Sequence, residues 1–248
     1  MSTIKDRPDD PVHILAGEER LNRAVGLQGR KDGIGEAIQA AAAACRGVES
    51  LLKNIEALRP LAESAKSAGC FEESYRLMAR FDVVGARMDE IVANSRHKGT
   101  NLLAGPGETL DITINPDEPA TLTLAGENAA RAGLGIAAVQ GLGLWWDWTD
   151  NVPDRAAIDN SLAQLAGAKA ALVAMAQNFV RQLRLIQTLS DFTDELIRVL
   201  KYEPEAPVPT GPDPESAAGL MSRTQQSLAV NFLSIASESY ALLLRLFS

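Results

Sequence analysis

Hydrophobic residues recur at intervals of three, four and seven in three long stretches, residues 17–68, 71–98 and 154–202. This spacing is typical of an amphipathic helix with one buried face. In the first stretch the apolar face consists of Leu27, Ile34, Ile38, Val48, Leu51, Leu52, Ile55, Leu58 and Leu61. Alanine, the strongest helix former, fills residues 40–44 of the same stretch. We expect Pro60 to kink or interrupt this helix, because proline lacks an amide hydrogen.

The second stretch begins after a break at Gly69 and is expected to close at Gly99, which would act as a helix C-cap. Its apolar face consists of Met78, Phe81, Val84, Met88, Ile91 and Val92. Because the connection to the first helix is short, we expect the two helices to lie antiparallel.

The third stretch carries a seven-residue repeat. Leu165, Leu172, Phe179 and Ile186 are each seven apart, Leu162 and Leu183 fall on the adjoining seam, and Ile158, Leu189, Phe192 and Leu196 extend the face. A repeat sustained over this length predicts coiled-coil packing against another long helix. Asp154 and Asp159 are the two candidates for its N-terminal turn, where carboxylates complement the helix dipole.

A different pattern occupies the middle of the chain. In residues 108–126, Leu110, Ile112 and Ile114 alternate with polar residues, and Leu122 and Leu124 show the same alternation after a proline-containing turn. This period of two predicts a β-hairpin. A loop rich in glycine and tryptophan follows at residues 131–153. We therefore predict a mainly α fold, an elongated antiparallel helical bundle with coiled-coil packing, a small β-hairpin and a C-terminal helix.

The two ends of the chain complete the predicted organisation. Residues 1–16 form an N-terminal turn or tail, and residues 203–215 form a linker whose five prolines exclude a helix. Residues 216–248 form an amphipathic helix, whose apolar stripe must be buried against a partner element or subunit. The residues predicted to make this interface are Leu220, Leu228, Phe232, Ile235, Leu243 and Phe247.

Composition removes several classes of function. The formal net charge is −8 and the pI is about 4.9, so there is no basic excess to attract nucleic acid or an anionic membrane surface. No apolar run has the length of a membrane span, and the N-terminus has no apolar core of signal-peptide length.

The sequence contains few candidates for chemistry. Residues 133–138 have the outline of a dinucleotide-binding loop but lack the strand–turn–helix context that such a loop requires. The three tryptophans Trp145, Trp146 and Trp148 are interpreted as a cover over one end of the bundle, with an exposed ligand or partner patch as the alternative. Cys45 and Cys70 have no metal-binding spacing and are interpreted as small residues on helix faces, with a disulfide between them as the alternative. We expect no catalytic residues, no metal site and no cofactor.

Four motifs, in order along the chain, carry a resemblance to a known family. They are RPDDPVHILAGEERLNRAVGLQGRKDGIGEAIQ near the start, MDEIVANSRHKGTNLLAG in the middle, LRLIQTLSDFTDELI at Leu183–Ile197, and SRTQQSLAVNFLSIASES followed by a terminal LRLF. Together they resemble bacterial flagellin, the subunit of the flagellar filament, over roughly residues 6–247. Relative to that family, the chain begins at the DDP turn rather than about fifty residues before it, and its linker is unusually rich in proline.

The resemblance implies a structural protein that is not an enzyme: a truncated flagellin-like subunit of the bacterial flagellum, secreted and involved in motility. Its partners would be other flagellin subunits or a second copy of itself, with a flagellar export chaperone at the C-terminal helix. The resemblance also implies an extracellular, flagellar location, or a cytoplasmic one if the absent N-terminal helix prevents export, and no long filaments from this chain alone. One alternative is a non-polymerising adaptor or regulator that binds the chaperone. Another is a helical enzyme with a pocket beside the tryptophans.

Overall fold

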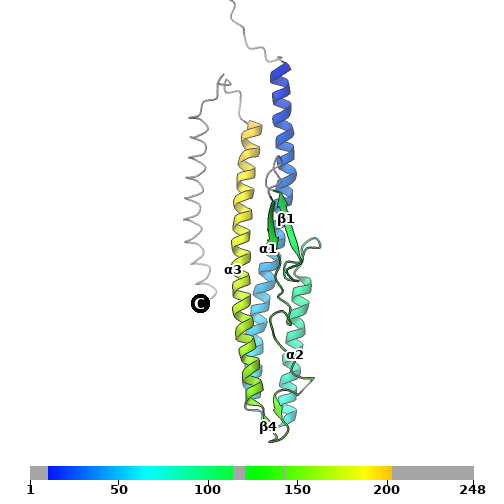
Figure 1. Ribbon diagram of the computed structural model, residues 1–248, viewed down its shortest axis with the longest axis vertical. Coiled ribbons are helices and arrows are strands. Elements are labelled where there is room, and N and C mark those ends of the chain that lie inside the picture. The colour runs from blue at the N-terminus through cyan, green and yellow to red at the C-terminus, as the bar shows by residue number, and fades with distance from the viewer. Residues whose placement is uncertain (1–10, 114–120, 142, 203–248) are drawn as a thin grey trace, which may run out of the picture. The chain divides into compact units, whose positions relative to one another are not determined.

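The computed structural model describes residues 11–113, 121–141 and 143–202. The described chain is mainly helical, as predicted, with two small antiparallel sheets (Figure 1). Its elements are α1 (Pro11–Ala65), α2 (Phe71–Asn94), β1 (Thr109–Thr113), β2 (Thr121–Ala125), β3 (Trp146–Asp147), β4 (Val152–Pro153) and α3 (Arg155–Tyr202). Residues 203–215 and 216–248, the predicted linker and terminal helix, lie outside the described residues.

The two longest helices, α1 and α3, lie side by side and antiparallel along most of their lengths (Figure 1). Three ion pairs of 2.5 Å between lysine Nζ and carboxylate oxygens connect α3 with α1 or, at Lys66, with the residue that follows α1: Lys31–Asp194, Lys169–Glu56 and Lys66–Asp159. Each step along α1 between these pairs is matched by an equal step back along α3. The two chain segments therefore keep one register between the first and the last of these pairs.

The coiled-coil prediction for α3 is confirmed by burial. Ile158, Leu165, Leu172, Phe179 and Ile186 are all buried at seven-residue intervals in the main core cluster. Opposite them, α1 contributes many small residues, which allow two backbones to approach closely: Ala37, Ala40, Ala41, Ala44, Ala62 and Ala65 are buried. Phe192, however, is 50 % exposed rather than part of the buried face. It lies next to Thr193, which takes the buried position in the repeat.

The first helix differs from expectation at its start, and Pro60 does not interrupt it. The helix begins at Pro11 rather than at residue 17, and it continues through Pro60 without interruption. Leu58 and Ala62, on either side of the proline, are fully buried. Their packing offsets the loss of one backbone hydrogen bond, which is how tertiary contacts override a helix breaker.

The structure places Gly99 in a turn rather than at the end of a helix. α2 ends at Asn94, with Ser95 as its C-cap. His97 and Thr100 then exchange two backbone hydrogen bonds of 2.9 and 3.0 Å around Lys98 and Gly99. Both central residues have positive φ, +47° and +92°, as in a type I′ turn.

The hairpin has the predicted pattern. β1 and β2 pair with Leu110 opposite Leu124 and Ile112 opposite Leu122. Ile112 and Leu124 are buried, whereas their polar neighbours along each strand are exposed. The second sheet, β3–β4, was not predicted, because strands of two residues leave no periodic signal.

Candidate interaction surfaces

The six residues predicted to form a subunit or partner interface lie outside the described residues. They are Leu220, Leu228, Phe232, Ile235, Leu243 and Phe247. The surfaces available for description are therefore those of α1, α2, α3 and the loops between them. Among these residues, no helix is long and apolar enough to cross a membrane, and no cluster of three or more potential metal ligands occurs.

One position of the α3 repeat lies beside the buried face, and we call it the outer heptad position. It is occupied by Gln164, Ala171, Asn178, Leu185, Phe192 and Val199. The first three residues are partly buried and the last three are exposed. The helix therefore divides into a covered half, residues 155–182, and an open half, residues 185–202.

In the covered half, the polar residues of the outer heptad position hold a loop. This covering loop, residues 126–141, follows the hairpin. Gln164 Oε1 accepts a hydrogen bond of 3.1 Å from the backbone nitrogen of Ala137. Asn178 Nδ2 donates one of 2.8 Å to Glu127 Oε1. The loop in turn contributes buried Leu134, Ile136 and Val139 to the core.

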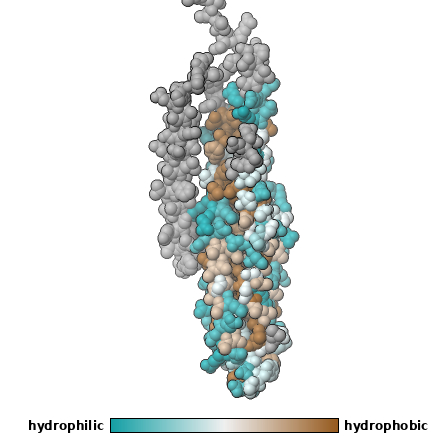
Figure 2. Space-filling model, viewed as in Figure 1, coloured by the Kyte–Doolittle hydropathy of each residue, from teal (hydrophilic) through white to brown (hydrophobic). Residues whose placement is uncertain are grey.

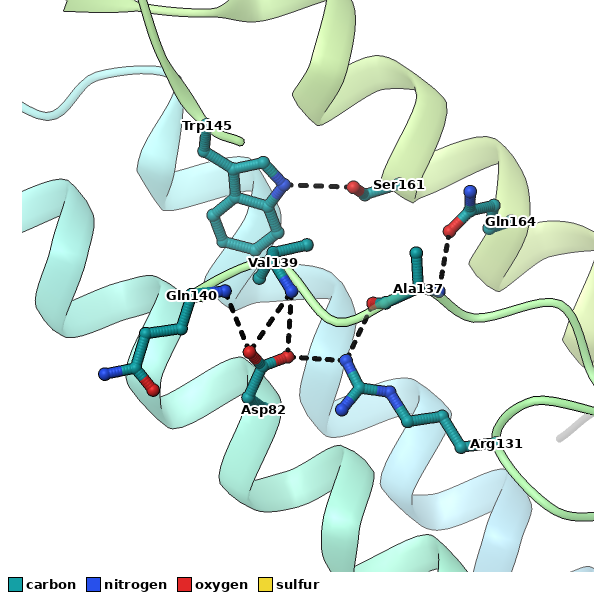
Figure 3. A network of polar contacts seen from close by, with 8 residues as sticks. All are labelled: Asp82, Arg131, Ala137, Val139, Gln140, Trp145, Ser161 and Gln164. Carbon is teal, nitrogen blue, oxygen red and sulfur yellow. Dashed lines mark hydrogen bonds and ion pairs between the residues drawn. The ribbon is translucent and has the colours of Figure 1, made fainter. Parts of the chain in front are cut away.

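A carboxylate on α2 holds the other side of the covering loop (Figure 3). Asp82 accepts backbone hydrogen bonds from Val139, at 3.1 Å to each oxygen, and from Gln140 at 2.8 Å. Arg131 Nη2 lies 2.5 Å from Asp82 Oδ1 and also donates to the carbonyl oxygen of Ala137 at 2.7 Å. One carboxylate thus binds two parts of the same loop, so the contact fixes its shape as well as its position.

The guanidinium of Arg131 depends on a glycine. A Cβ atom added at Gly85 of α2 would lie 2.7 Å from its Cζ and Nη1 atoms. The same guanidinium lies over the Phe81 ring, 5.9 Å from the centroid, a cation–π geometry. Only 12 % of the Arg131 side chain is exposed. Because Gly85 has no side chain, the guanidinium of Arg131 has room to lie against α2 and pair with Asp82.

The tryptophans lie at the end of the bundle where α2 and α3 begin. Trp145 is fully buried, lies edge-on to Phe81 at 4.9 Å between ring centroids, and donates from Nε1 to Ser161 Oγ at 2.9 Å. Trp146 is also buried. Trp148 is 64 % exposed and packs on Phe71 at 4.4 Å. The cluster covers the bundle end, as first interpreted, and leaves one aromatic ring at the surface.

In the open half, apolar residues take the outer heptad position. Leu185, Phe192 and Val199 are 53 %, 50 % and 40 % exposed and are seven residues apart. Figure 2 shows apolar surface gathered along the upper part of α3. Leu21 and Val25, toward the N-terminal end of α1, are 58 % and 64 % exposed. We call Leu185, Phe192 and Val199 the open stripe.

The remaining candidates for chemistry have structural roles. Residues 133–138 belong to the covering loop, and the preceding strands form a hairpin rather than a βαβ unit. Cys45, half-buried, and Cys70, exposed, are both free. Burial raises the pKa of the Cys45 thiol, with Glu49 adding to the shift. Asp154 caps α3 by accepting from the backbone nitrogen of Ala157 at 3.0 Å.

His97 takes part in a contact between the turn after α2 and helix α1. Its Nε2 atom lies 2.8 Å from Glu36 Oε2, and Lys98 Nζ donates to Glu36 Oε1 at 2.6 Å. Lys98 first, and His97 second, lower the pKa of the Glu36 carboxyl by hydrogen bonding. The contact joins the turn to α1 near the place where the open half begins.

Sequence reasoning missed the Asp82–Arg131 contact and the open stripe. The first has no sequence signal, because 49 residues separate its partners. The second has one. At every seventh position from Gln164, the sequence has polar or small residues as far as Asn178 and large apolar residues after it.

Comparison with solved structures finds the same fold in a known protein. The crystal structure of Bacillus cereus flagellin matches with a TM-score of 0.53 and 15 % sequence identity, covering 65 % of this chain and 88 % of that chain. No protein-family model matches the sequence, and neither does any curated protein. The described part of the chain therefore has a flagellin-like fold.

Proposed function

We propose that this protein is a structural subunit related to the flagellar filament, and that it acts by helix–helix packing between copies rather than by catalysis. The observation that carries the proposal is the open stripe. Three large apolar side chains at heptad spacing form one line on a helix, and an apolar line of this kind is the usual contact seam between helices. The flagellin-like fold supports the same conclusion.

The polar groups of the described residues support a structural role as well. Asp82, Arg131 and Gln164 all bind backbone groups of the covering loop. Their hydrogen bonds hold a connection in place and leave no acid–base pair directed toward a substrate. A flagellar location and association with flagellin subunits follow from this proposal, and the predicted interface from Leu220 to Phe247 belongs to it.

Sedimentation velocity on the full chain over a range of concentrations tests the proposal. We expect reversible self-association that Phe192→Asp weakens at least tenfold, because a carboxylate in a helix seam must be desolvated. The matched control is Val83→Asp, which changes an isolated exposed apolar residue of α2 (70 % exposed) and should leave association unchanged. A chain that remains monomeric at all concentrations, or that responds equally to both variants, would contradict the proposal.

A further inference from the structure

We propose that the aromatic surface at the end of the bundle binds an arginine-rich segment of another protein. We call this surface the aromatic end patch and define it by Phe71, Tyr75, Trp148 and Val152. It lies where α2 and α3 begin (Figure 1). The open stripe starts about 45 Å further along α3, at 1.5 Å per residue. The inference therefore goes beyond the proposed function and does not depend on it.

The aromatic end patch exposes large apolar side chains that contact one another. Trp148 is 64 % exposed, Val152 47 % and Tyr75 41 %. The Phe71 ring lies between the other two rings, with its centroid 4.4 Å from that of Trp148 and 5.6 Å from that of Tyr75. Val152 pairs with Asp147, the residue before Trp148, in the β3–β4 sheet. Single exposed apolar residues are normal on a protein surface, whereas a contiguous group of them marks an interaction site.

The exposed tryptophan is held in place before any partner binds. Phe71, on which it packs, also contacts the buried Trp146 ring at 5.9 Å between centroids. Asp147 accepts hydrogen bonds from the backbone nitrogens of Thr149, at 2.8 Å, and of Asp150, at 3.4 Å. A side chain that is already ordered loses little conformational entropy on binding. Tryptophan and tyrosine are also among the residues that most often dominate the binding energy of protein interfaces.

The charges around the patch indicate the chemistry of its partner. Residues 69–75 and 143–154, which form the patch, contain no Lys, Arg or His and five carboxylates: Glu72, Glu73, Asp147, Asp150 and Asp154. Within the part of the chain that the structure describes, none of the five forms an ion pair, not even with the nearby Arg76 or Arg155. These negative charges repel nucleic acid and anionic membranes, and they attract a cationic partner.

Arginine is the cation that suits both features of this surface. Its planar guanidinium stacks on an aromatic face, best on tryptophan, and pairs with a carboxylate through two parallel hydrogen bonds. Trp148 lies between Asp147 and Asp150 in the sequence, so the ring and the carboxylates belong to one short turn. Lysine, a more strongly hydrated point charge, makes neither the stacked nor the bidentate contact. Because carboxylates lie on both segments of the patch, a chain with several arginines fits it better than one free cation.

Binding of a synthetic peptide to the full-length chain tests the inference. The probe is a fluorescein-labelled peptide of six Arg-Gly repeats, and fluorescence anisotropy measures its dissociation constant. We expect Trp148→Ala to weaken binding at least tenfold, because the stacking surface is removed. The matched control is Val83→Ala, at an isolated exposed position of α2, and should leave the dissociation constant unchanged. A peptide of six Lys-Gly repeats should bind several-fold more weakly than the arginine peptide.

Two charge-matched variants separate this patch from general attraction to an acidic chain. Glu72→Gln combined with Asp150→Asn removes two carboxylates of the patch segments and should weaken binding of the arginine peptide at least fivefold. Glu49→Gln combined with Glu90→Gln removes two exposed carboxylates that lie more than about 20 Å along their helices from this end. This second pair should have a much smaller effect. Equal losses from the two pairs, or unchanged binding in Trp148→Ala, would overturn the inference.

Fluorine NMR locates the contact at one residue. Labelling with 5-fluorotryptophan gives one signal for each of the three tryptophans, and Trp148→Phe identifies that of Trp148. The arginine peptide should shift this signal and leave those of the buried Trp145 and Trp146 nearly in place. No shift, or an equal shift of all three signals, would overturn the inference. A Trp148 signal that moves with protein concentration alone would assign the surface to a second copy and would also overturn it.

The proposed function and this inference fail separately. Phe192→Asp should weaken self-association and leave binding of the arginine peptide unchanged, because the open stripe and the aromatic end patch lie far apart along α3. Trp148→Ala should do the reverse. Loss of both activities in either variant would show that the two surfaces are one and would overturn the inference.

Discussion

Residues at the outer heptad position of α3 have different surroundings in the covered half and in the open half, and their side chains differ accordingly. In the covered half, Gln164 and Asn178 bind the covering loop through polar contacts. In the open half, Leu185, Phe192 and Val199 present large apolar side chains to solvent. An isolated helix in water would favour polar residues at exposed positions. The reversed arrangement is the one that the proposed helix–helix packing between copies requires.

The comparison also separates two ways of covering a helix. A loop brings backbone amides that need hydrogen-bond acceptors, so the helix and its neighbours supply Gln164 and Asp82. A second helix has satisfied its own backbone, so packing against it requires apolar side chains instead. The side chains of the covered half thus suit the loop that lies over it, and those of the open half suit the helix partner that we propose.

The largest expected difference between the halves is in stability. Phe179→Ala should lower the free energy of unfolding by about 3–5 kcal/mol, as burial of a large aromatic side chain implies, since Phe179 is fully buried. Phe192→Ala, on the same helix but half exposed, is the matched control and should cost less than about 1 kcal/mol in the monomer. Urea denaturation measures both. Equal losses of unfolding free energy in the two variants would mean that the covered and open halves of α3 do not differ in burial.

Removal of the Asp82–Arg131 ion pair, which holds the covering loop, should have the next largest effect on stability. Arg131→Met leaves the carboxylate of Asp82, which is 18 % exposed, without its cation. We expect a loss of about 3 kcal/mol, because breaking one side of a largely buried ion pair leaves a charge unpaired. Arg198→Met, which breaks the exposed Arg198–Glu195 pair on the open half, is the control and should change stability by less than about 1 kcal/mol. A small loss in Arg131→Met would show that the backbone amides alone hold the loop.

Periodicity predicted the architecture well. The seven-residue series from Leu165 to Ile186 and the alternation around Ile112 are produced by burial of one face, so the sequence reports them directly. The helix is not interrupted at Pro60 and Gly99 is not the C-cap of α2, because the local preferences of both residues depend on context. Packing of Leu58 and Ala62 carries α1 through the proline, and a type I′ turn uses the positive φ of Gly99.

The candidate surface was harder to predict. The terminal residues Leu220 to Phe247 were chosen because their stripe requires a partner, and that reasoning remains a prediction. The open stripe on α3 was overlooked since Phe192 looks identical in sequence to a core residue. The structure shows that Thr193, seven residues after Ile186, takes the buried position and that Phe192 faces outward, and the change from Asn178 to Leu185 is the sequence signal that was overlooked.

Hydrogen exchange should show the same division along α3. In the monomer, amides of residues 187–199 should exchange at least tenfold faster than those of residues 165–182, because fewer side chains pack over the open half. Raising the protein concentration into the associating range should slow exchange in residues 187–199 alone. Uniform protection along the helix in the dilute protein would contradict the division into two halves.

The smallest effect concerns Glu36, which lies near the boundary between the halves. Lys98 and His97 lower its pKa below the ordinary value of 4.5. A carboxyl with a lower pKa in the folded state stabilises the fold above its unfolded pKa, and that stabilisation is lost as pH falls through the folded value. Glu36→Gln should therefore lower the denaturation midpoint at pH 7, and the difference from the parent should shrink as pH falls below about 4.5.

The matched control for this charge change is Glu90→Gln, which removes an exposed carboxylate of α2. It reports the general effect of removing one negative charge from an acidic chain. Subtracting it isolates the contact of Glu36 with Lys98 and His97. If the corrected difference stays constant from pH 7 to pH 3, the turn at residues 97–100 is held to α1 by packing, and the boundary of the covered half does not depend on this ion pair.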